Sequence, residues 1–430
     1  MNYFSAKILK VANKKISPYA GVSYVNSEFI RCGLNQLLDN ELGSRGKGAK
    51  YSHSDIIRNW TNVFFCGGEC AEDIQVYLRD TLDGMPDNVA PSADTLLRGF
   101  KELAVENTLV TSKEGKTYNF NINEKMNDLN IKSLLLTKQL EAGKAYDLDY
   151  DNQIIAHDKF DAMTTYKKTT GYFPGVATFG NKVIYIENRD GNANVKLDQR
   201  NTIERLCKLL KKNNLKINRV RMDAGSYSKE IINVVAANCK RFYIRANKCE
   251  SLTEQIRQIE NWQTVVINFK TYQVATLKFT QFFEDREYRL VVMREEKDDQ
   301  QLDMFDGKFI YRCILTNDWE STEQEVIEYY NERGSAEKVF DVMNNDFGWK
   351  HLPYSDMHNN TVYLIVTAMI KKNYNYIIQK VSEVFEDIPA TSRLKKFIFR
   401  FISVPGRWVY RSRQWTLYLY TDRPYEKLVA

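Results

Sequence analysis

The sequence has 430 residues with a formal net charge of +6, and a chain of this length is expected to form two or three domains. Its hydrophobic content of 43% and charged content of 27% are those of an ordinary globular protein, and no run approaches the roughly 20 apolar residues of a membrane-spanning helix. The first residues lack the apolar core of a secretory signal, and seven cysteines do not suggest a disulfide framework, so we expect a cytoplasmic protein without membrane contact.

Residues 1–135 are expected to form a mainly helical N-terminal region. One apolar-periodic segment begins at Asp55, and another follows Pro91, where Ser92 or Asp94 is a suitable N-cap. Capped helices of this kind suit a helix-turn-helix that binds DNA ends, and they suit a structural bundle equally well. Residues 121–130 are predicted to be a polar connector.

From residue 145 the pattern changes to strands alternating with helices. The expected elements are strands at 147–155, 176–179 and 183–186, a helix containing Ile203 and Leu210, a strand ending at Met222, a helix capped by Ser226 or Ser228, and a strand at 242–244. This is the element order of a ribonuclease-H-like α/β core, a mixed five-stranded sheet with flanking helices in which the first strand lies beside the fourth. We assign residues 145–248 and 319–380 to that core.

Residues 249–318 are predicted to interrupt the core as a β-rich insertion. Strand-like runs occur at 265–267, 288–292 and 309–311, and the polar residues 295–301 are expected to form a loop between two of them.

Two stretches concentrate positive charge without an acidic residue between the cations. Residues 205–221 hold seven Lys and Arg residues, and the C-terminal region, residues 381–430, alternates cations with aromatic rings from Arg393 to Trp415. Cations neutralise phosphates and aromatic rings stack on bases, which favours a nucleic-acid partner. A solvated helix face and a core with a charged rim are the alternative explanations of the two stretches.

Three carboxylates lie in contexts that suit a metal-dependent phosphodiester site. Asp151 ends a strand pattern that also places Asp147 and Asp149 on one face, Asp223 follows a predicted strand, and Glu337 lies in a segment of helical character. Acids that come from separate elements can hold two divalent ions against a phosphate. Three acids on one face repel one another unless a cation or basic groups lie near; an exposed edge strand and a helix-capping Asp223 are the structural alternatives.

The helical segment adds a second polar constellation. On a continuous helix, Tyr330, Arg333 and Glu337 would share one face, with Asn344 near the same stripe. Burying a hydroxyl, a guanidinium and a carboxylate together requires a polar partner, such as a phosphate and a metal ion. An exposed Arg333–Glu337 ion pair at i,i+4 is the alternative.

These segments resemble the DDE transposases of bacterial insertion sequences, in the branch marked by a Tyr-x2-Arg-x3-Glu-x6-Lys signature. Tyr330, Arg333 and Glu337 match its first three positions. Residues 222–227 are similar to the stretch around the family's second Asp, and residues 148–153 are similar to the stretch around its first.

The resemblance implies a function and the residues that carry it. Asp151, Asp223 and Glu337 would bind two Mg²⁺ ions, with Mn²⁺ as a substitute, and would catalyse DNA cleavage and strand transfer. Tyr330 and Arg333 would contact DNA phosphates. The expected partners are double-stranded DNA, as terminal inverted repeats and as target, and a second copy of the chain in a homodimer on paired ends. The expected location is the bacterial cytoplasm, at the nucleoid when the protein is bound to DNA.

Two rival functions stay open at this point. One is a ribonuclease-H-like nuclease that cuts without strand transfer, and the other is a catalytically inactive DNA-binding relative. Asn344 stands where the branch has Lys, which favours the second rival unless Lys338 or Lys350 replaces that contact. Asp149 is an alternative to Asp151 as a ligand, and the sequence specifies neither the repeat and target sequences nor a hairpin intermediate.

Overall fold

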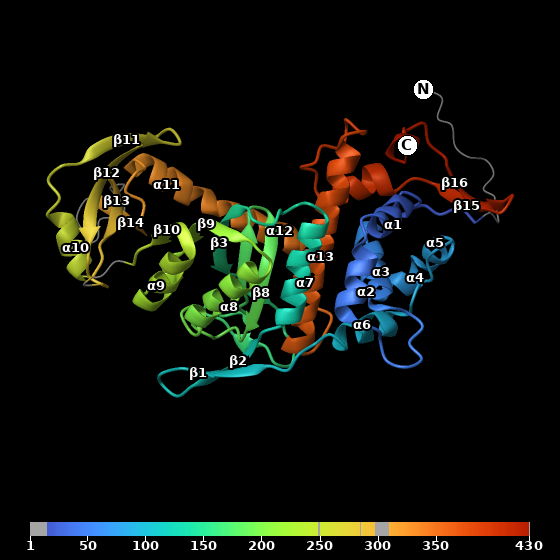
Figure 1. The fold of residues 1–430 in the computed structure, drawn as a ribbon, viewed down its shortest axis with the longest axis horizontal. Helices are drawn as coiled ribbons and strands as arrows, with labels where there is room; N and C mark the ends of the chain where they lie inside the picture. The colour runs from blue at the N-terminus through green and yellow to red at the C-terminus, as the bar shows by residue number, and fades with distance from the viewer. Residues whose placement is uncertain (1–14, 248–249, 284, 297–308, 430) are drawn as a thin grey trace, which may run out of the picture. The chain divides into compact units, whose positions relative to one another are not determined.

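The computed structural model describes residues 15–247, 250–283, 285–296 and 309–429. The chain divides into two compact units, one formed by Met1–Gly99 and Asn373–Ala430 and the other by Phe100–Lys372. The first unit therefore combines most of the predicted N-terminal region with the predicted C-terminal region. The boundaries between the units fall inside α6 (Ala93–Lys101) and α13 (Met357–Ser382) (Figure 1).

An eleven-stranded mixed sheet organises the described part of the second unit (Figure 1). Its strands lie in the order β1-β2-β8-β7-β3-β9-β10-β14-β13-β12-β11. Their bounds are β1 Thr108–Thr111, β2 Thr117–Asn121, β3 Ala145–Asn152, β7 Gly175–Phe179, β8 Lys182–Arg189, β9 Lys216–Met222, β10 Cys239–Arg245, β11 Gln263–Ile267, β12 Lys270–Phe279, β13 Tyr288–Glu296 and β14 Phe309–Thr316. A small separate sheet, β4 (Ile155–Ala156), β6 (Thr170–Tyr172) and β5 (Met163–Thr164), lies in the chain between β3 and β7.

The predicted adjacency of the first and fourth strands is confirmed. The five strands predicted between residues 145 and 248 are β3, β7, β8, β9 and β10, and in space they lie in the order β8-β7-β3-β9-β10. β9 runs parallel to both β3 and β10, with Asp149 opposite Arg221 and Tyr150 opposite Met222. Because parallel neighbours end at the same edge of a sheet, the residues that follow Tyr150 and Met222 come out beside each other.

The predicted β-rich insertion is a continuation of the same sheet. β14 pairs antiparallel with β10, and β13, β12 and β11 follow it outward. Strands at 265–267, 288–292 and 309–311 are confirmed as β11, β13 and β14, whereas β12 was not predicted. β13 extends to Glu296, and the rest of the predicted polar loop lies outside the described residues.

Helices cover both faces of this sheet. α8 (Gln199–Lys212), α9 (Lys229–Asn238) and α10 (Glu250–Arg257) bury their apolar faces in one hydrophobic cluster, and α11 (Glu323–Asn331) packs in a second. Side chains alternate between the faces of a strand, so Phe242 and Ile244 join the first cluster while Tyr243 joins the second. Of the two predicted N-caps of α9, Ser228 is the one whose hydroxyl accepts a hydrogen bond from the Ile231 N–H.

The predicted connector at 121–130 is wrong, because α7 (Glu124–Leu136) begins there. The Asn123 side chain caps this helix by accepting a hydrogen bond from the Met126 N–H. Asn127 donates to the Ile186 carbonyl at 2.8 Å and accepts from the Ile186 N–H at 2.9 Å, and Asn130 donates to the Val183 carbonyl. These side-chain amides provide hydrogen-bond partners for backbone N–H and C=O groups of β8, as a neighbouring strand would. The β1–β2 hairpin likewise places strands in a region that was predicted to be helical.

Asp318 fixes the connection between β14 and α11. It is 1% exposed, and it accepts hydrogen bonds from the Tyr243 hydroxyl at 2.7 Å and from the backbone N–H groups of Glu320 and Ser321. Burial raises the pKa of Asp318, but these hydrogen bonds outweigh burial and lower it to about 2.

We expect Asp318→Asn to lower the free energy of unfolding at pH 7 by about 2–3 kcal/mol, because a shift of two pKa units is worth roughly that amount. The folded-state pKa is depressed, so this stability is present above the unfolded pKa near 4 and is lost as the pH falls towards 2. Urea unfolding of both proteins from pH 7 to pH 3 measures the difference, which should narrow below pH 4. A constant difference would contradict the assigned charge effect.

The first unit is built mainly from helices. Its elements are α1 Val22–Arg31, α2 Leu34–Leu42, α3 His53–Phe65, α4 Asp73–Val76, α5 Arg79–Asp83, most of α6, the end of α13, α14 Leu394–Phe397, the single-turn η4 Ile398–Ile402 and η5 Tyr425–Leu428, and the strands β15 Gly406–Arg411 and β16 Gln414–Leu419. Ser92 accepts a hydrogen bond from the Thr95 N–H and is therefore the N-cap of α6. None of the helices that the structure describes combines the length and apolarity needed to cross a bilayer.

Candidate active site

Asp151 and Asp223 meet at one edge of the central sheet. Asp151 lies near the end of β3, and Asp223 directly follows β9. Burial raises the pKa of Asp151 to about 6, the nearby Arg333 guanidinium opposes this effect, and the negative charge of Asp223 adds to it. Two carboxylates whose negative charges repel each other in a low-dielectric environment attract a cation. The first two predicted acids are therefore electrostatically coupled.

Arg333 contacts this site from a different element of the fold. Its Nη1 lies 2.7 Å from Asp151 Oδ2, and both side chains are largely buried. The Tyr330 hydroxyl donates to the carbonyl of Met222, the residue before Asp223, at 3.3 Å. The segment after β14 therefore reaches both strand ends, as the resemblance implied.

The prediction of one continuous helix through this segment is wrong. α11 ends at Asn331, a 3₁₀ turn covers Glu332–Gly334, and α12 (Ser335–Asp346) begins after it. Arg333 pairs with Asp151, and among the side chains described no ion pair joins it to Glu337.

Among the described residues, Glu337 does not form a metal-binding group with the two aspartates. It is exposed in the first turn of α12. Within the described ranges, no three His, Cys, Asp or Glu side chains are grouped so that they could hold a metal ion. The structure thus brings together two of the three predicted ligands.

The other two acids of β3 are held by arginines of β9. Both Asp149 oxygens accept hydrogen bonds from Arg221, at 2.6 and 2.8 Å, and Asp147 is paired with Arg219. The Tyr329 ring lies against both guanidinium groups, 3.8 Å from the Arg219 Cζ and 4.6 Å from the Arg221 Cζ. The predicted repulsion within the acidic face is thus relieved by basic groups, and Asp149, held at both oxygens, is less suited than Asp151 to bind a metal.

The donor set at the strand ends fits a hard divalent cation. Asp151 and Asp223 offer carboxylate oxygens, the ligands that Mg²⁺ and Mn²⁺ prefer. The Arg333 guanidinium is the positive charge that balances Asp151 in the present arrangement. A metal ion could therefore be held here by exchange of one cationic partner for another.

A cavity of about 490 Å³ adjoins Asp223. It is lined by residues 191–196 from the loop after β8, by Ala224, Gly225 and Asn247, and by the rings of Tyr166 and Phe173. That loop approaches Gly225 closely: a Cβ there would lie 3.0 Å from Val195 Cγ1 and 3.1 Å from an Asp223 oxygen, so these side chains would have to shift by a few tenths of an ångström. Sequence reasoning missed this cavity, although the Gly-Asn-Ala-Asn run at 191–194 signals a turn.

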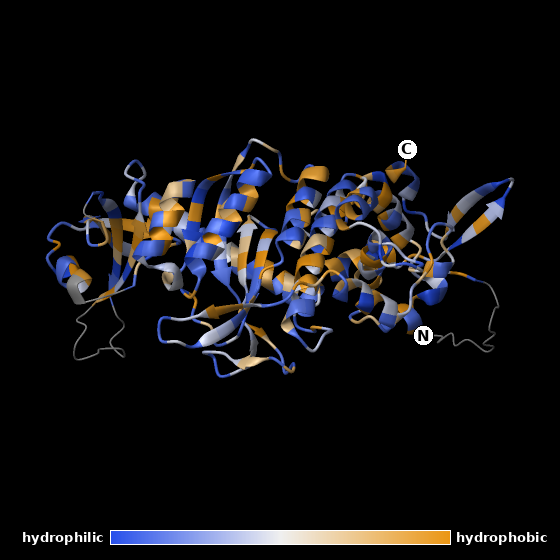
Figure 2. Cartoon of the chain, turned by 60° about the horizontal axis from the view of Figure 1, so that its bottom comes forward, coloured by the Kyte–Doolittle hydropathy of each residue, from blue (hydrophilic) through white to orange (hydrophobic). Residues whose placement is uncertain are grey.

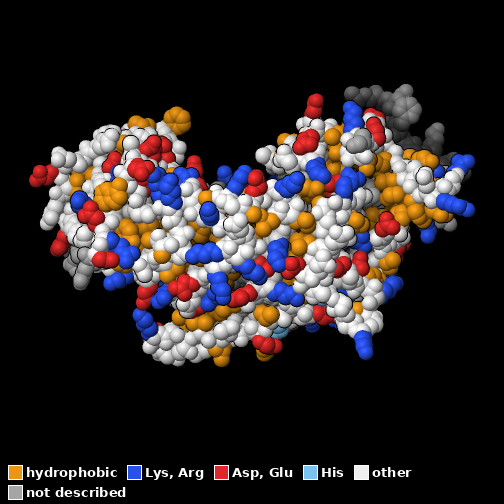
Figure 3. Space-filling view, in the orientation of Figure 1, with side chains coloured by type: hydrophobic (Ala, Val, Ile, Leu, Met, Phe, Trp, Pro, Cys, Tyr) orange, Lys and Arg blue, Asp and Glu red, His pale blue; other side chains and the backbone are white. Residues whose placement is uncertain are grey.

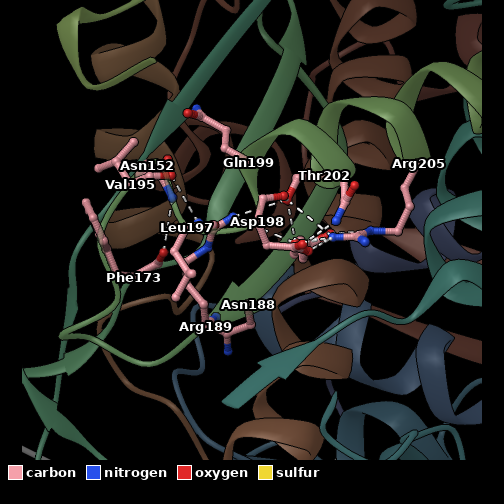
Figure 4. A network of polar contacts seen from close by, with 12 residues as sticks. Asn152, Phe173, Asn188, Arg189, Val195, Leu197, Asp198, Gln199, Thr202 and Arg205 are labelled. Carbon is pink, nitrogen blue, oxygen red and sulfur yellow. Dashed lines mark hydrogen bonds and ion pairs between the residues drawn. The ribbon is translucent and has the colours of Figure 1, made fainter. Parts of the chain in front are cut away.

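The fully buried Arg189 connects the cavity to β3 (Figure 4). It donates to the carbonyls of Val195 and Leu197 at 3.4 and 3.2 Å and to the Tyr150 hydroxyl at 3.5 Å. Since Tyr150 precedes Asp151, one guanidinium ties the cavity loop to the strand that carries the first acid. Arg189 was not predicted, because an isolated arginine at the end of a strand carries no distinguishing pattern.

The remaining predicted positions lie on α12 or shortly after it. Asn344 is half-buried on α12, Lys338 is exposed, and Lys350 donates to Asn345. Trp349, in the same region, is fully buried with its Nε1 donating to Thr367, as a core residue would be.

Comparison with models of known protein families identifies a family for this chain. A model of the family described as "Transposase DDE domain group 1" matches residues 8–430. No curated protein matches the sequence. Among solved structures, a cryo-EM structure of a piggyBac transposase synaptic complex with hairpin DNA is similar at 11% sequence identity and a TM-score of 0.46, covering 89% of this chain and 78% of that chain. The match over nearly the entire length shows that the chain belongs to the family of DDE transposases, group 1.

Proposed function

We propose that this DDE transposase is the enzyme of a bacterial insertion sequence, which binds the terminal inverted repeats of its element and moves it by cut-and-paste transposition. The observation that carries the proposal is the meeting of Asp151 and Asp223 at the ends of the parallel strands β3 and β9. The strand order β8-β7-β3-β9-β10 supports a ribonuclease-H-like core, in which adjacent strand ends supply the acids.

Asp151, Asp223 and Glu337 are the proposed ligands of two divalent ions, Mg²⁺ or Mn²⁺. When bound, such ions activate a water or a DNA 3′-hydroxyl and stabilise the leaving oxygen in an in-line displacement. The negative charge of Asp223 acts on Asp151 in the free protein, which supports a common role for the two acids, and the exposed Glu337 would complete the site when DNA is bound.

Arg333 and Tyr330 are the proposed phosphate contacts. Arg333 neutralises Asp151 in the free protein, and a cation on Asp151 would release its guanidinium for two hydrogen bonds to the non-bridging oxygens of a phosphate. The Tyr330 hydroxyl is held at the Met222 carbonyl, one residue from Asp223, where it would orient a phosphate beside the second acid.

Joining two element ends in one complex requires a dimer, and we propose a homodimer on paired ends. The proposed location is the bacterial cytoplasm, at the nucleoid when the protein is bound to DNA.

The test uses a labelled duplex that carries the element's own end, a target plasmid, and Mg²⁺ or Mn²⁺. We expect the wild type to cut at the element boundary and to join the freed 3′ end to the target, and Asp223→Ala to bind without cutting. Cutting without joining would establish the nuclease alternative. Binding without cutting by both proteins would establish an inactive relative, and Asn344→Lys, which restores the signature, would then show whether that position is responsible.

A further inference from the structure

The hairpin formed by β15 and β16 is fixed at its base. Gly406 and Ser17 exchange two backbone hydrogen bonds, at 2.8 and 3.0 Å, and the Tyr420 N–H donates to the Pro405 carbonyl. A Cβ at Gly406 would lie 2.6 Å from the Ala20 Cβ, so this contact requires glycine. Beyond its base the hairpin projects from the helices of its unit (Figure 2).

One face of this hairpin is aromatic and exposed. Tyr410 and Trp415 are cross-strand partners with ring centroids 5.0 Å apart, and they are 59% and 50% exposed. Trp408 and Leu417 form the next pair on the same face. A two-stranded hairpin is marginally stable by itself, and exposed aromatic rings grouped in this way are typical of a surface that binds a partner.

The other face and the turn of this hairpin carry positive charge that no described carboxylate of the unit neutralises. Arg407, Arg411 and Arg413 are exposed, and among the described residues no carboxylate forms an ion pair with them. No acid occurs in the sequence from Arg393 to Thr421. Hydrophobic side chains and the blue ends of cationic ones gather over this hairpin at the right of Figure 3.

The cations of the other basic stretch, residues 205–221, differ from those of the hairpin. Within residues 205–221, four of the cations form ion pairs with acids of their own unit: Arg205, Lys212, Arg219 and Arg221. These ion pairs give most of that stretch a structural role, which differs from the solvated helix face considered as its alternative, whereas the hairpin cations are exposed.

We propose that the β15–β16 hairpin is a DNA-binding ribbon, with Arg407, Arg411 and Arg413 on phosphates and Tyr410 and Trp415 against the groove. The major groove, about 12 Å wide, admits a two-stranded ribbon, and a polyanion is the partner that complements three exposed guanidinium groups that pair with no described carboxylate. A second copy of the chain fits less well, since a symmetric contact would place these cations against identical ones. The inference rests on the proposed function for the identity of the partner as DNA.

The test is the salt dependence of DNA binding by the full-length protein without divalent metal. We compare wild type, Arg407→Gln/Arg411→Gln/Arg413→Gln, and the matched triple Arg→Lys variant, by anisotropy of a labelled duplex at several KCl concentrations. Each phosphate contact contributes about 0.9 to the slope of log K against log salt, so the Gln variant should lose roughly 2–3 units of slope. The Lys variant should keep the slope, because Lys retains the charge.

Equal slopes and affinities for the wild type and the Gln variant would overturn the proposal. It would also be overturned if Tyr410→Ser/Trp415→Ser converted a dimer to a monomer in sedimentation velocity and left DNA binding unchanged, since the hairpin would then be a contact between copies. The cleavage test of the proposed function is independent of both outcomes: hairpin-dependent DNA binding by a protein that neither cuts nor joins DNA would refute that function and leave this inference standing.

Discussion

Under the proposed function, asparagine in place of Asp151 or Asp223 is expected to lower the rate of DNA cleavage by on the order of 10³-fold, because each carboxylate would supply charge to a metal site worth several kcal/mol in the transition state. DNA binding should stay close to that of the wild type. Single-turnover cleavage of a labelled element-end duplex in Mg²⁺ measures the rate, and anisotropy measures the binding. Glu260→Gln, which removes an exposed carboxylate from the same unit, is the control and should cleave normally.

The proton on Asp151 adds a pH dependence to this prediction. Its folded-state pKa is raised to about 6, chiefly by burial. Protonation therefore favours the folded, metal-free state below pH 4, and this stabilisation is lost as the pH rises through 6. A cation must compete with that proton, so the apparent Mg²⁺ affinity should fall about tenfold per pH unit below pH 6. The Asp151→Asn variant should lack this dependence, and its persistence there would assign the titration to another group.

The local pattern of the sequence predicted most of the central sheet. Alternating apolar residues, together with the glycine-containing connection at Gly180, were sufficient to locate β7, β8, β9 and β10, and chain order then implied their neighbours. The pattern failed at 121–130 because Asn127 and Asn130 are polar for a structural reason: their amides bond the edge of β8. Side chains that hydrogen-bond to the edge of a strand must be polar, so a helix that carries them has the composition expected of a loop.

Pairings between residues far apart in the sequence could not be predicted from local sequence patterns. Which arginine meets which aspartate depends on the register of β3 against β9, and the paired residues are 72 positions apart in sequence. The break between α11 and α12 was missed for a related reason. Arg333 reaches Asp151 from a 3₁₀ turn, and helical spacing through Gly334 gave no indication of that turn. For the candidate site, the sequence indicated the acids and Arg333 and favoured Asp151 over Asp149 by resemblance, whereas the pairing of Asp149 with Arg221 is visible only in the fold.

We expect Asp149→Asn to lower the free energy of unfolding and to leave cleavage nearly unchanged, in contrast to Asp151→Asn. It leaves the largely buried Arg221 guanidinium without its buried carboxylate partner, so that only the exposed Glu332, at 3.5 Å, still pairs with it. Removing one member of a buried ion pair lowers the free energy of unfolding by about 3–5 kcal/mol, because the remaining charge is desolvated and no longer compensated within the protein interior. Urea unfolding should show this loss, and cleavage per folded molecule should stay within a few-fold of the wild type. Loss of cleavage without loss of stability would instead make Asp149 a metal ligand.

The double variant Asp149→Leu/Arg221→Met separates charge from packing. Replacing both members of a buried pair by apolar side chains of similar volume removes the unpaired charge, and such replacements are often neutral or stabilising. We therefore expect the double variant to recover most of the stability that Asp149→Asn loses. Arg221 also donates to the Tyr329 carbonyl at 2.8 Å, one residue before Tyr330, so Arg221→Met removes a link between β9 and the segment that carries Arg333. A stable double variant with slow cleavage would show that the ion pair positions Arg333, and unchanged cleavage would show that it serves stability alone.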